Sequence, residues 1–353
     1  MSPNDNELGI VIPTPNPSHE SGAHMPLVQR SLRSVTALSA LAVALLVSLS
    51  LLTVGAGTAS AWGPPGTKGF RDATINGYGM DVKTRVRTWA SQTSNPKTAP
   101  TVIFLDGLRA TNDVNGWEKE TNVAYLSRHG YNVVMPVGGQ SSFYEDWNAA
   151  SPTAGQRAPY RWRSVLTKSL PAYLNSIGFS GNRTLVGLSM AASSAVMMAT
   201  DYPQLYKRAV SMSGFMHLTA PGMQTMLRAA AFDAGRFDLN NMYGIFPNIS
   251  AFTRDPTLNL PRMAGKHFLL YAGTGAWGGR NPVGRTWVDN IGTGLDGSAI
   301  EVLSMEQSRT FALAAQIAGA KVRADFPAVG IHSWGYWQDE IWNISNSGWF
   351  FNG

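Results

Sequence analysis

The chain of 353 residues contains no cysteine, which excludes disulfide bonds, thiol nucleophiles and cysteine-ligated metal sites. Its stability must therefore come from a hydrophobic core, and 44% apolar residues can supply one in a chain of this length. Heptads and fixed-period repeats are also missing, which argues against coiled-coil and solenoid architectures. The 36 glycines and 20 prolines indicate many tight turns rather than low complexity.

Charge of either sign is scarce, with 28 Lys and Arg against 22 Asp and Glu and a net charge of +6. No run of basic residues is interleaved with aromatic residues, so the sequence does not support binding to nucleic acid. The small basic excess is compatible with contact with an anionic envelope surface. We expect neither a cofactor nor a metal ion in the chemistry developed below.

The N-terminal 61 residues have a composition unlike that of the remaining chain. Residues 1–27 are polar and contain several prolines, and Arg30 and Arg33 then precede an apolar run over residues 35–54. The triplet Ala59-Ser60-Ala61 follows this run. A basic flank, an apolar stretch and an A-x-A site together predict a secretory signal peptide behind a disordered leader.

Cleavage before Trp62 would release an exported protein of residues 62–353. The alternative is a retained membrane anchor, because about 20 apolar residues can span a bilayer. Translation from Met25 would shorten the leader and leave a signal peptide of ordinary length.

After residue 62, short apolar segments alternate with segments of helical periodicity. The expected strands are residues 101–105, 132–136, 184–188, 209–213 and 268–272, and the expected helices are residues 124–129, 162–176, 190–201 and 307–318. Residues 73–91 alternate as strands do, so we expect an antiparallel edge there. The pattern predicts one α/β domain with a mostly parallel central sheet and helices on both faces.

A serine lies at the junction of one such strand and helix. Gly187-Leu188-Ser189-Met190-Ala191 matches the nucleophile elbow G-x-S-x-G of the α/β-hydrolase fold, with alanine in the final position. The tight turn requires small residues two before and two after the serine, and it exposes the serine Oγ above the sheet. It also directs the backbone N–H of Met190 toward a tetrahedral oxyanion. We therefore predict that Ser189 is a catalytic nucleophile.

A serine hydroxyl needs an adjacent base, which is nearly always histidine. Outside the first 61 residues the histidines are His129, His217, His267 and His332. The order serine, acid, histidine in this fold excludes His129, and His217 follows the next strand too closely. His267 begins a strand and so lies at the wrong end of the sheet. His332, in a loop near the C-terminus, is the predicted base.

The acid cannot be chosen from the pattern alone. It should follow the strand that ends near Ala272, yet residues 273–280 contain no carboxylate. The remaining candidates are Asp289, Asp296, Glu301 and Glu306.

Residues 217–263 interrupt the alternation of strands and helices. They contain a Met- and Ala-rich helical segment at residues 223–231, followed by a loop rich in Pro and Asn. Insertions at this point of the α/β-hydrolase fold commonly cover the site, so we expect a flexible apolar wall for a long acyl chain. The alternative is that the Met and Phe side chains only fill the core.

Several motifs closely resemble those of the secreted mycolyltransferases of mycolic-acid bacteria, the antigen 85 family, which also has cysteine-free members that acylate proteins. The motifs are Phe104-Leu105-Asp106-Gly107-Leu108-Arg109-Ala110, Asn115-Gly116-Trp117, Met135-Pro136-Val137-Gly138-Gly139-Gln140-Ser141-Ser142-Phe143-Tyr144, Asp146-Trp147, Gly187–Ala191, Arg254-Asp255-Pro256-Thr257 and His332-Ser333-Trp334. The longest of them, MPVGGQSSFY, is far more specific than the elbow alone. The similarity extends from about Arg71 to Trp337.

The resemblance implies transfer of a mycoloyl chain from trehalose monomycolate to an acceptor, through an acyl-Ser189 intermediate, in the cell envelope. The acceptor would be a second trehalose monomycolate, arabinogalactan or a protein serine. In the family the acid is a glutamate at a fixed distance before a Phe-containing helix that ends in Ala-Gly. Glu301 keeps this distance to Phe311 and Gly319, and Glu306 is the reserve candidate.

The resemblance also implies further site residues. The oxyanion hole would use the backbone N–H groups of Leu108 and Met190. The sugar site would include Asp106, Arg109, Ser333 and Trp334. An Asp-Gly-x-Arg loop directly after a strand lies at the carboxyl edge of the sheet, where ligands bind. Alternatively, Asp106 and Arg109 form a loop-fixing ion pair, and Trp334 only packs.

Two other functions compete with acyl transfer. An exported carboxylesterase would use the same three residues and pass the acyl group to water. A noncatalytic envelope or matrix-binding protein on this fold would be expected to lack the nucleophile, whereas this chain retains Ser189.

Overall fold

The computed structural model describes residues 68–281 and 287–351, without the side chains of residues 287–293. The predicted leader, the signal peptide and the A-x-A site therefore lie outside the described residues. Among the helices of the described part, none combines the length and apolar character that a membrane span requires.

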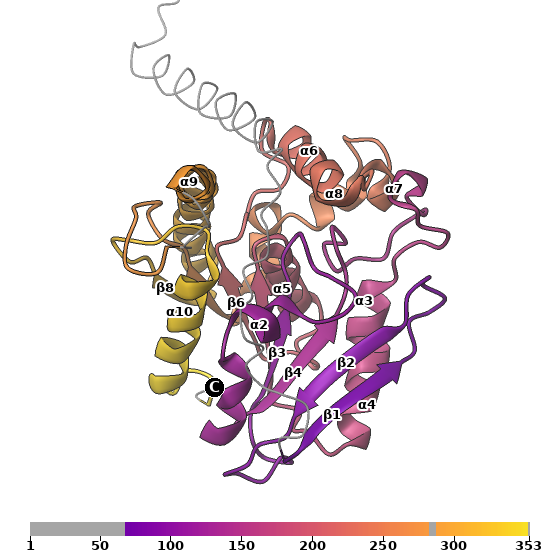
Figure 1. Ribbon diagram of the computed structural model, residues 1–353, viewed down its shortest axis with the longest axis vertical. Coiled ribbons are helices and arrows are strands. Elements are labelled where there is room, and N and C mark those ends of the chain that lie inside the picture. Colours follow the sequence, from indigo (N-terminus) through magenta and orange to yellow (C-terminus); the bar gives the residue numbers. More distant parts are fainter. Residues whose placement is uncertain (1–67, 282–286, 352–353) are drawn as a thin grey trace, which may run out of the picture. The chain divides into compact units, whose positions relative to one another are not determined.

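Within the described residues, eight strands form a single sheet in the order β1-β2-β4-β3-β5-β6-β7-β8 (Figure 1). The strands are β1 Phe70–Ile75, β2 Thr84–Trp89, β3 Thr101–Leu105, β4 Asn132–Val137, β5 Arg183–Leu188, β6 Arg208–Met212, β7 His267–Tyr271 and β8 Lys321–Asp325. β1 and β2 are antiparallel, and β4 to β8 run parallel to one another together with β3. The predicted mostly parallel sheet with an antiparallel edge is confirmed.

Helices cover both faces of this sheet (Figure 1). The α-helices of the described residues are α2 Gly116–Glu120, α3 Trp162–Ser164, α4 Leu170–Ser176, α5 Met190–Asp201, α6 Met223–Gly235, α7 Asn240–Tyr243, α8 Ile249–Thr253, α9 Trp287–Ile317 and α10 Trp334–Asn346. A π-helical turn, Val165–Ser169, joins α3 to α4. Short 3-10 helices span Val123–His129, Pro152–Ala154, Pro256–Leu258 and Leu260–Met263.

The two faces of the sheet carry two separate hydrophobic cores. On β3, Ile103 and Leu105 pack into the core beneath α4, α5 and α9, and Val102 and Phe104 pack into the core beneath α2 and α10. Successive strand residues point to opposite faces, so a strand covered on both sides is apolar throughout. This explains why the central strands appear in the sequence as continuous apolar runs.

Three elements differ from the sequence-based expectation. β8 was not expected, because this edge strand has the sequence KVRAD and remains partly exposed, without an apolar run. α9 begins at Trp287 rather than at residue 307. Its first half was not expected to be helical because it is rich in glycine, a poor helix former. The segment 124–129 forms a 3-10 helix rather than an α-helix.

Candidate active site

Ser189 occupies a strained turn between β5 and α5. Its backbone has φ 51° and ψ −109°, a conformation that non-glycine residues rarely adopt. A Cβ at Gly187 would lie 2.3 Å from the carbonyl oxygen of Ala191, so only glycine fits there. The turn is closed by the N–H of Ser189, which donates to the carbonyl of Met212 on β6 at 2.8 Å.

Three side chains from distant parts of the chain form a continuous hydrogen-bonded row. Ser189 Oγ lies 3.0 Å from His332 Nε2, and His332 Nδ1 lies 2.9 Å from Glu301 Oε2. If Nδ1 carries the proton, it donates to the carboxylate, and Nε2 is left to accept the serine proton. This geometry suits general-base activation of a serine hydroxyl.

Glu301 is held in place by groups behind the histidine. Its carboxylate is fully buried, and its Oε1 accepts hydrogen bonds from Ser213 Oγ at 2.7 Å and from the N–H of Gly273 at 2.6 Å. Ser213 Oγ in turn accepts from Trp337 Nε1 at 2.8 Å. The Trp337 ring also meets the His332 ring edge to face, with centroids 4.8 Å apart. Buried partners thus hold both the Glu301 carboxylate and the His332 ring in place.

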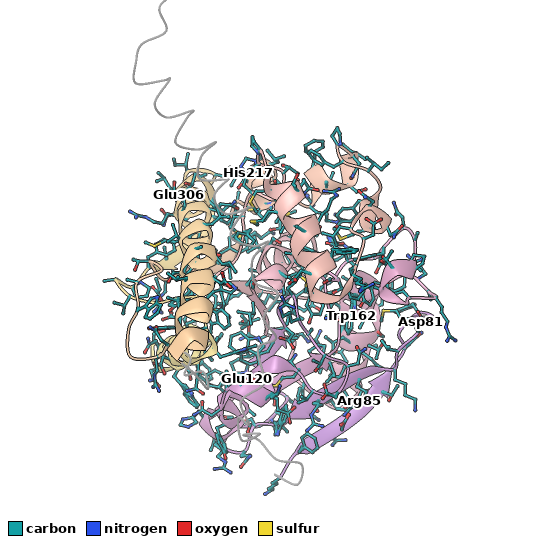
Figure 2. The ribbon with its side chains drawn as sticks, turned by 45° about the horizontal axis from the view of Figure 1, so that its top comes forward. Asp81, Arg85, Glu120, Trp162, His217 and Glu306 are labelled. Atoms are coloured by element: carbon teal, nitrogen blue, oxygen red, sulfur yellow. The ribbon has the colours of Figure 1, made fainter. Side chains whose placement is uncertain are left out.

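The other candidates do not join this row. Asp296 lines the cavity described below, but His332 pairs with Glu301 instead. Glu306 is exposed on α9, five residues beyond Glu301 (Figure 2). The Asp289 side chain lies outside the described residues. His217 is partly exposed, with its Nε2 4.0 Å from Asp255.

A cavity of about 430 Å³ opens onto Ser189 and His332. Such a volume is in the usual range for small-molecule sites. Its apolar lining residues are Leu108, Val114, Phe143, Leu188, Met190, Phe215, Met226, Leu227, Ala230, Ala299 and Ile300. Its polar and aromatic lining residues include Asp106, Arg109, Thr111, Lys119, Glu120, Asp233, Asp296, Trp334 and Trp337. The cavity therefore offers both an apolar and a hydrogen-bonding surface beside one hydroxyl group.

Asp106 is nearly fully buried at the end of β3. Its carboxylate accepts hydrogen bonds from the N–H groups of Gly116 at 2.6 Å and Gly107 at 2.8 Å. Burial raises the pKa of this carboxyl to about 6, because desolvation outweighs the two hydrogen bonds, which lower it. A Cβ at Gly116 would meet both Asp106 and Trp334 at 2.7 Å, so this glycine brings the carboxylate and the indole ring together.

Arg109 does not pair with Asp106. Its Nη2 donates to Asp233 Oδ2 on α6 at 2.5 Å, and 64% of the arginine side chain is exposed. An ion pair this exposed adds about 0–1 kcal/mol to stability, so its main effect is to orient the guanidinium at the cavity. The alternative of a loop-fixing Asp106–Arg109 pair is therefore wrong.

Of the neighbouring residues Ser333 and Trp334, only Trp334 lines the cavity. The Trp334 ring lines the cavity and packs edge to face against Trp117 and Trp337. Ser333 does not line the cavity, and its Oγ donates to the carbonyl of Arg280 at 3.5 Å. Leu108 and Met190, by contrast, both line the cavity together with Ser189.

Comparisons with known proteins identify the family of this chain. The family model "Putative esterase" matches residues 77–346. The Ag85C diacylglycerol acyltransferase/mycolyltransferase of Mycobacterium avium is 31% identical over 86% of this chain and 84% of its own. The Ag85B counterpart of Mycolicibacterium smegmatis is 33% identical over 86% of this chain and 91% of its own. This chain belongs to the Ag85 family of esterase-like proteins.

Solved structures show the same fold. MPT51 (FbpC1) of Mycobacterium tuberculosis has a TM-score of 0.65 and 24% identity, covering 79% of this chain and 97% of that one. The fluorophosphonate-binding serine hydrolase FphF of Staphylococcus aureus has a TM-score of 0.56 and 14% identity, covering 80% and 98%. The Ag85-family chain thus has the α/β-hydrolase fold predicted from its sequence.

In this Ag85-family chain, two supporting residues of the site were not anticipated. Ser213, with φ 51°, sits just after β6, and its position at the carboxyl edge of the sheet is the one signal that could have pointed to it. Trp337 lies only five residues beyond His332, but no local sequence pattern indicates its contact with Ser213. Ala192, next to the elbow, packs against Gly214, where an added Cβ would lie 2.1 Å from the Ala192 Cβ.

Proposed function

We propose that the protein is an exported serine acyltransferase that moves a mycoloyl chain from trehalose monomycolate to an acceptor through an acyl-Ser189 intermediate. The observation that carries this proposal is the Ser189–His332–Glu301 row, whose Ser189 and His332 line a cavity with both apolar and polar lining residues. The names of the Ag85 relatives add support for mycoloyl transfer.

In the first half-reaction, Ser189 Oγ attacks the ester carbonyl while His332 Nε2 takes its proton. The Glu301 carboxylate orients the imidazole and stabilises its charged form. The N–H groups of Leu108 and Met190 donate to the oxyanion of the tetrahedral intermediate. Trehalose then leaves with the proton from His332, and the chain remains as an ester on Ser189.

In the second half-reaction, a hydroxyl of the acceptor attacks this ester. His332 takes the hydroxyl proton and returns it to Ser189 Oγ as the acyl bond breaks, so the enzyme is regenerated. The acceptor is a second trehalose monomycolate, arabinogalactan or a protein serine, each of which offers a hydroxyl group.

The polar and the apolar lining residues correspond to the two parts of this substrate. Carboxylate and guanidinium groups such as Asp106 and Arg109 hydrogen-bond sugar hydroxyls, and the Trp334 ring can stack on a sugar face. Met226 and Leu227 of α6 offer apolar surface to the start of the acyl chain. Residues 217–263 would then serve as the cover of the acyl site, and Figure 1 shows α6, α7 and α8 grouped beyond one end of the sheet.

Hydrolysis by an exported carboxylesterase is the second candidate, favoured by the match to the "Putative esterase" family model. Purified protein would be incubated with trehalose monomycolate, with and without added trehalose, and the products identified by mass spectrometry. Transfer predicts free trehalose together with a doubly acylated product. Free mycolic acid as the main product, whether or not trehalose is added, would favour the esterase instead.

Arg109→Ala is expected to impair transfer from trehalose monomycolate while largely sparing hydrolysis of a short-chain aryl ester. The aryl ester has a good leaving group and no sugar to recognise. Loss of a hydrogen bond to a charged group costs about 1.5–3 kcal/mol, or roughly tenfold to a hundredfold in kcat/KM. The matched control is Arg323→Ala, which removes an ion pair with Asp325 on the edge strand β8, and neither of these residues lines the cavity. An equal loss on both substrates would mean that Arg109 supports the loop rather than the sugar.

Sugar binding is also expected to weaken at acid pH. The pKa of Asp106 is raised to about 6, so its carboxylate is charged above that pH and becomes protonated below it. The charged form is the stronger acceptor for sugar hydroxyls. From about pH 7 to about pH 5, the Kd of trehalose should rise by up to about tenfold. Calorimetry on Ser189→Ala measures this without turnover, and Asp106→Asn should remove the pH dependence. A dependence that persists in Asp106→Asn would assign the titration to another group.

A further inference from the structure

The segment Gly138–Tyr144, here called the brace loop, is the most distinctive motif of the sequence, yet the proposed reaction gives it no task. It follows β4 and lies within hydrogen-bonding reach of the turn after β3 and of the start of α5. Five of its seven residues have positive φ, including the non-glycine residues Ser141, Phe143 and Tyr144 at 50–54°. Non-glycine residues persist in this conformation only where their surroundings hold them, and such clusters occur at functional sites.

The brace loop holds the turn that carries Leu108. The N–H of Ser141 donates to the carbonyl of Leu108 at 3.0 Å. Two residues earlier in that turn, the N–H of Asp106 donates to the Tyr144 hydroxyl at 2.9 Å, and this hydroxyl donates to the carbonyl of Gly138 at 3.2 Å. Tyr144 thus ties the turn after β3 to the beginning of the brace loop through a single oxygen atom.

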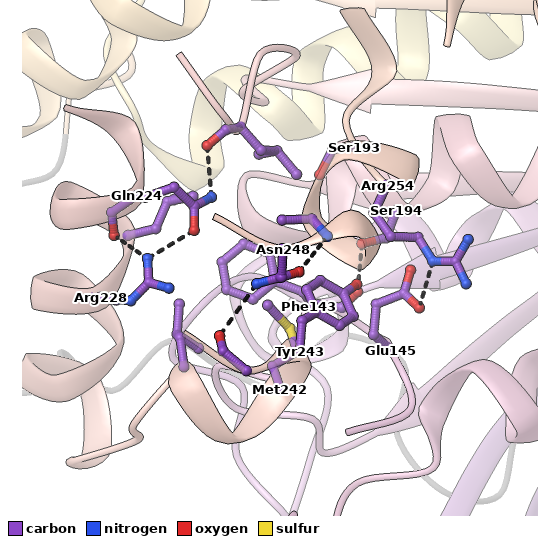
Figure 3. A pocket seen from close by; sticks show the side chains of 15 residues that line it. Phe143, Glu145, Ser193, Ser194, Gln224, Arg228, Met242, Tyr243, Asn248 and Arg254 are labelled. Carbon is purple, nitrogen blue, oxygen red and sulfur yellow. Dashed lines mark hydrogen bonds and ion pairs between the residues drawn. The ribbon is translucent and has the colours of Figure 1, made fainter. Parts of the chain in front are cut away.

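The same loop contacts the residue that would supply the other oxyanion donor. The N–H of Phe143 donates to Met190 Sδ at 3.3 Å. The carbonyl of Phe143 accepts from Ser194 Oγ on α5 at 2.5 Å, a contact drawn in Figure 3. Directly after the loop, the buried Glu145 carboxylate meets Arg254 at 3.3 Å, also drawn in Figure 3, and Arg163 at 3.4 Å.

The brace loop further reaches the wall of the cavity formed by α6. Gln140 Nε2 donates to the carbonyl of Ala234 at 2.7 Å, next to the Asp233 that holds Arg109. One short segment with a strained backbone therefore joins the turn after β3, the helix α5 and the helix α6.

We propose that the brace loop sets the positions of the Leu108 and Met190 N–H groups for oxyanion stabilisation, with Tyr144 as its positioning residue. This rests on the proposed function, in which those two groups receive the oxyanion. Tyr144 is fully buried and does not line the cavity, so it acts through the turn rather than on the substrate. An oxyanion donor is effective only within a narrow range of distance to the developing charge, so a small shift of the turn reduces the rate.

The test compares Tyr144→Phe with Tyr206→Phe. Tyr206 is an equally buried phenol whose hydroxyl donates to the carbonyl of Leu166, and neither residue lines the cavity. Tyr144→Phe should lower kcat for both the aryl ester and trehalose monomycolate by about tenfold to a hundredfold, somewhat less than deletion of one oxyanion donor. For the aryl ester, KM and the acid limb of the pH–rate profile should stay unchanged, because the serine and the base are intact and this substrate has no sugar to bind. Tyr206→Phe should lose stability only.

Equal kcat values for the two variants, or a loss confined to KM, would overturn the proposal. Ser194→Ala, which releases the Phe143 carbonyl, gives a second test should Tyr144→Phe not fold, with its neighbour Ser193→Ala as control. It should reproduce the loss of kcat in smaller measure, and a kcat equal to that of Ser193→Ala would contradict the proposal. The two proposals can fail separately. If the wild-type protein does not transfer acyl groups but Tyr144→Phe still lowers kcat on the aryl ester, mycoloyl transfer is rejected and the positioning role of the brace loop is retained.

Discussion

Ser189→Ala is expected to abolish acyl transfer and ester hydrolysis and to prevent covalent labelling by a serine-directed phosphonate. The row from Ser189 through His332 to Glu301 leaves no other hydroxyl within reach of the base among the described residues. Loss of a catalytic serine lowers kcat on the order of 10⁶-fold. A residual rate above that of water can persist through the oxyanion hole and substrate binding.

Ser193→Ala is the matched control, since it removes a buried serine hydroxyl from the same helix without touching the row. It should keep both labelling and turnover. Phosphonate labelling that survives in Ser189→Ala would place the nucleophile at another serine.

Glu301→Gln is expected to have the second-largest effect. A neutral amide cannot stabilise the imidazolium of His332, and its NH₂ group would face either the histidine or the donors Ser213 and Gly273. Substituting the corresponding carboxylate in a serine triad lowers kcat by about 10⁴-fold. The measurement is kcat on the aryl ester, with circular dichroism to verify folding.

Glu306→Gln is the control for the acid, because this side chain is exposed on the same helix. It should leave kcat within about twofold of wild type, as surface substitutions usually do. The reverse order of effects would assign the acid to Glu306.

The nucleophile and the central sheet could be predicted because their signals are local. The elbow at residues 187–191 depends on sterics within five residues, and strands buried on both faces appear as apolar runs. His332 followed from the order of the residues along the chain. These features need no knowledge of distant contacts.

The acid shows where such reasoning ends. In the order typical of this fold the carboxylate follows β7, but the loop after β7 contains none and contributes instead the N–H of Gly273, which donates to Glu301. Glu301 itself lies within α9 rather than ahead of a helix, and only the family resemblance singled it out. The contact between Glu301 on α9 and the end of β7 is made in three dimensions, so no fixed spacing in the sequence predicts it.

Partners far apart in the chain were likewise invisible to the sequence. Arg109 and Asp233 are 124 residues apart, and Trp337 and Ser213 are also 124 residues apart. The brace loop was conspicuous as a motif, but its contacts with Leu108 and Met190 depend on how β3, β4 and β5 are ordered in the sheet.

The central claim is that a mycoloyl chain is carried on Ser189. Its most direct test is rapid acid quenching of the wild-type protein with trehalose monomycolate, followed by proteolysis and peptide mass spectrometry. We expect an acyl adduct on the peptide that contains Ser189, and loss of the adduct when trehalose is added before the quench. An adduct on a different residue, or turnover with no adduct and no effect of trehalose, would contradict it.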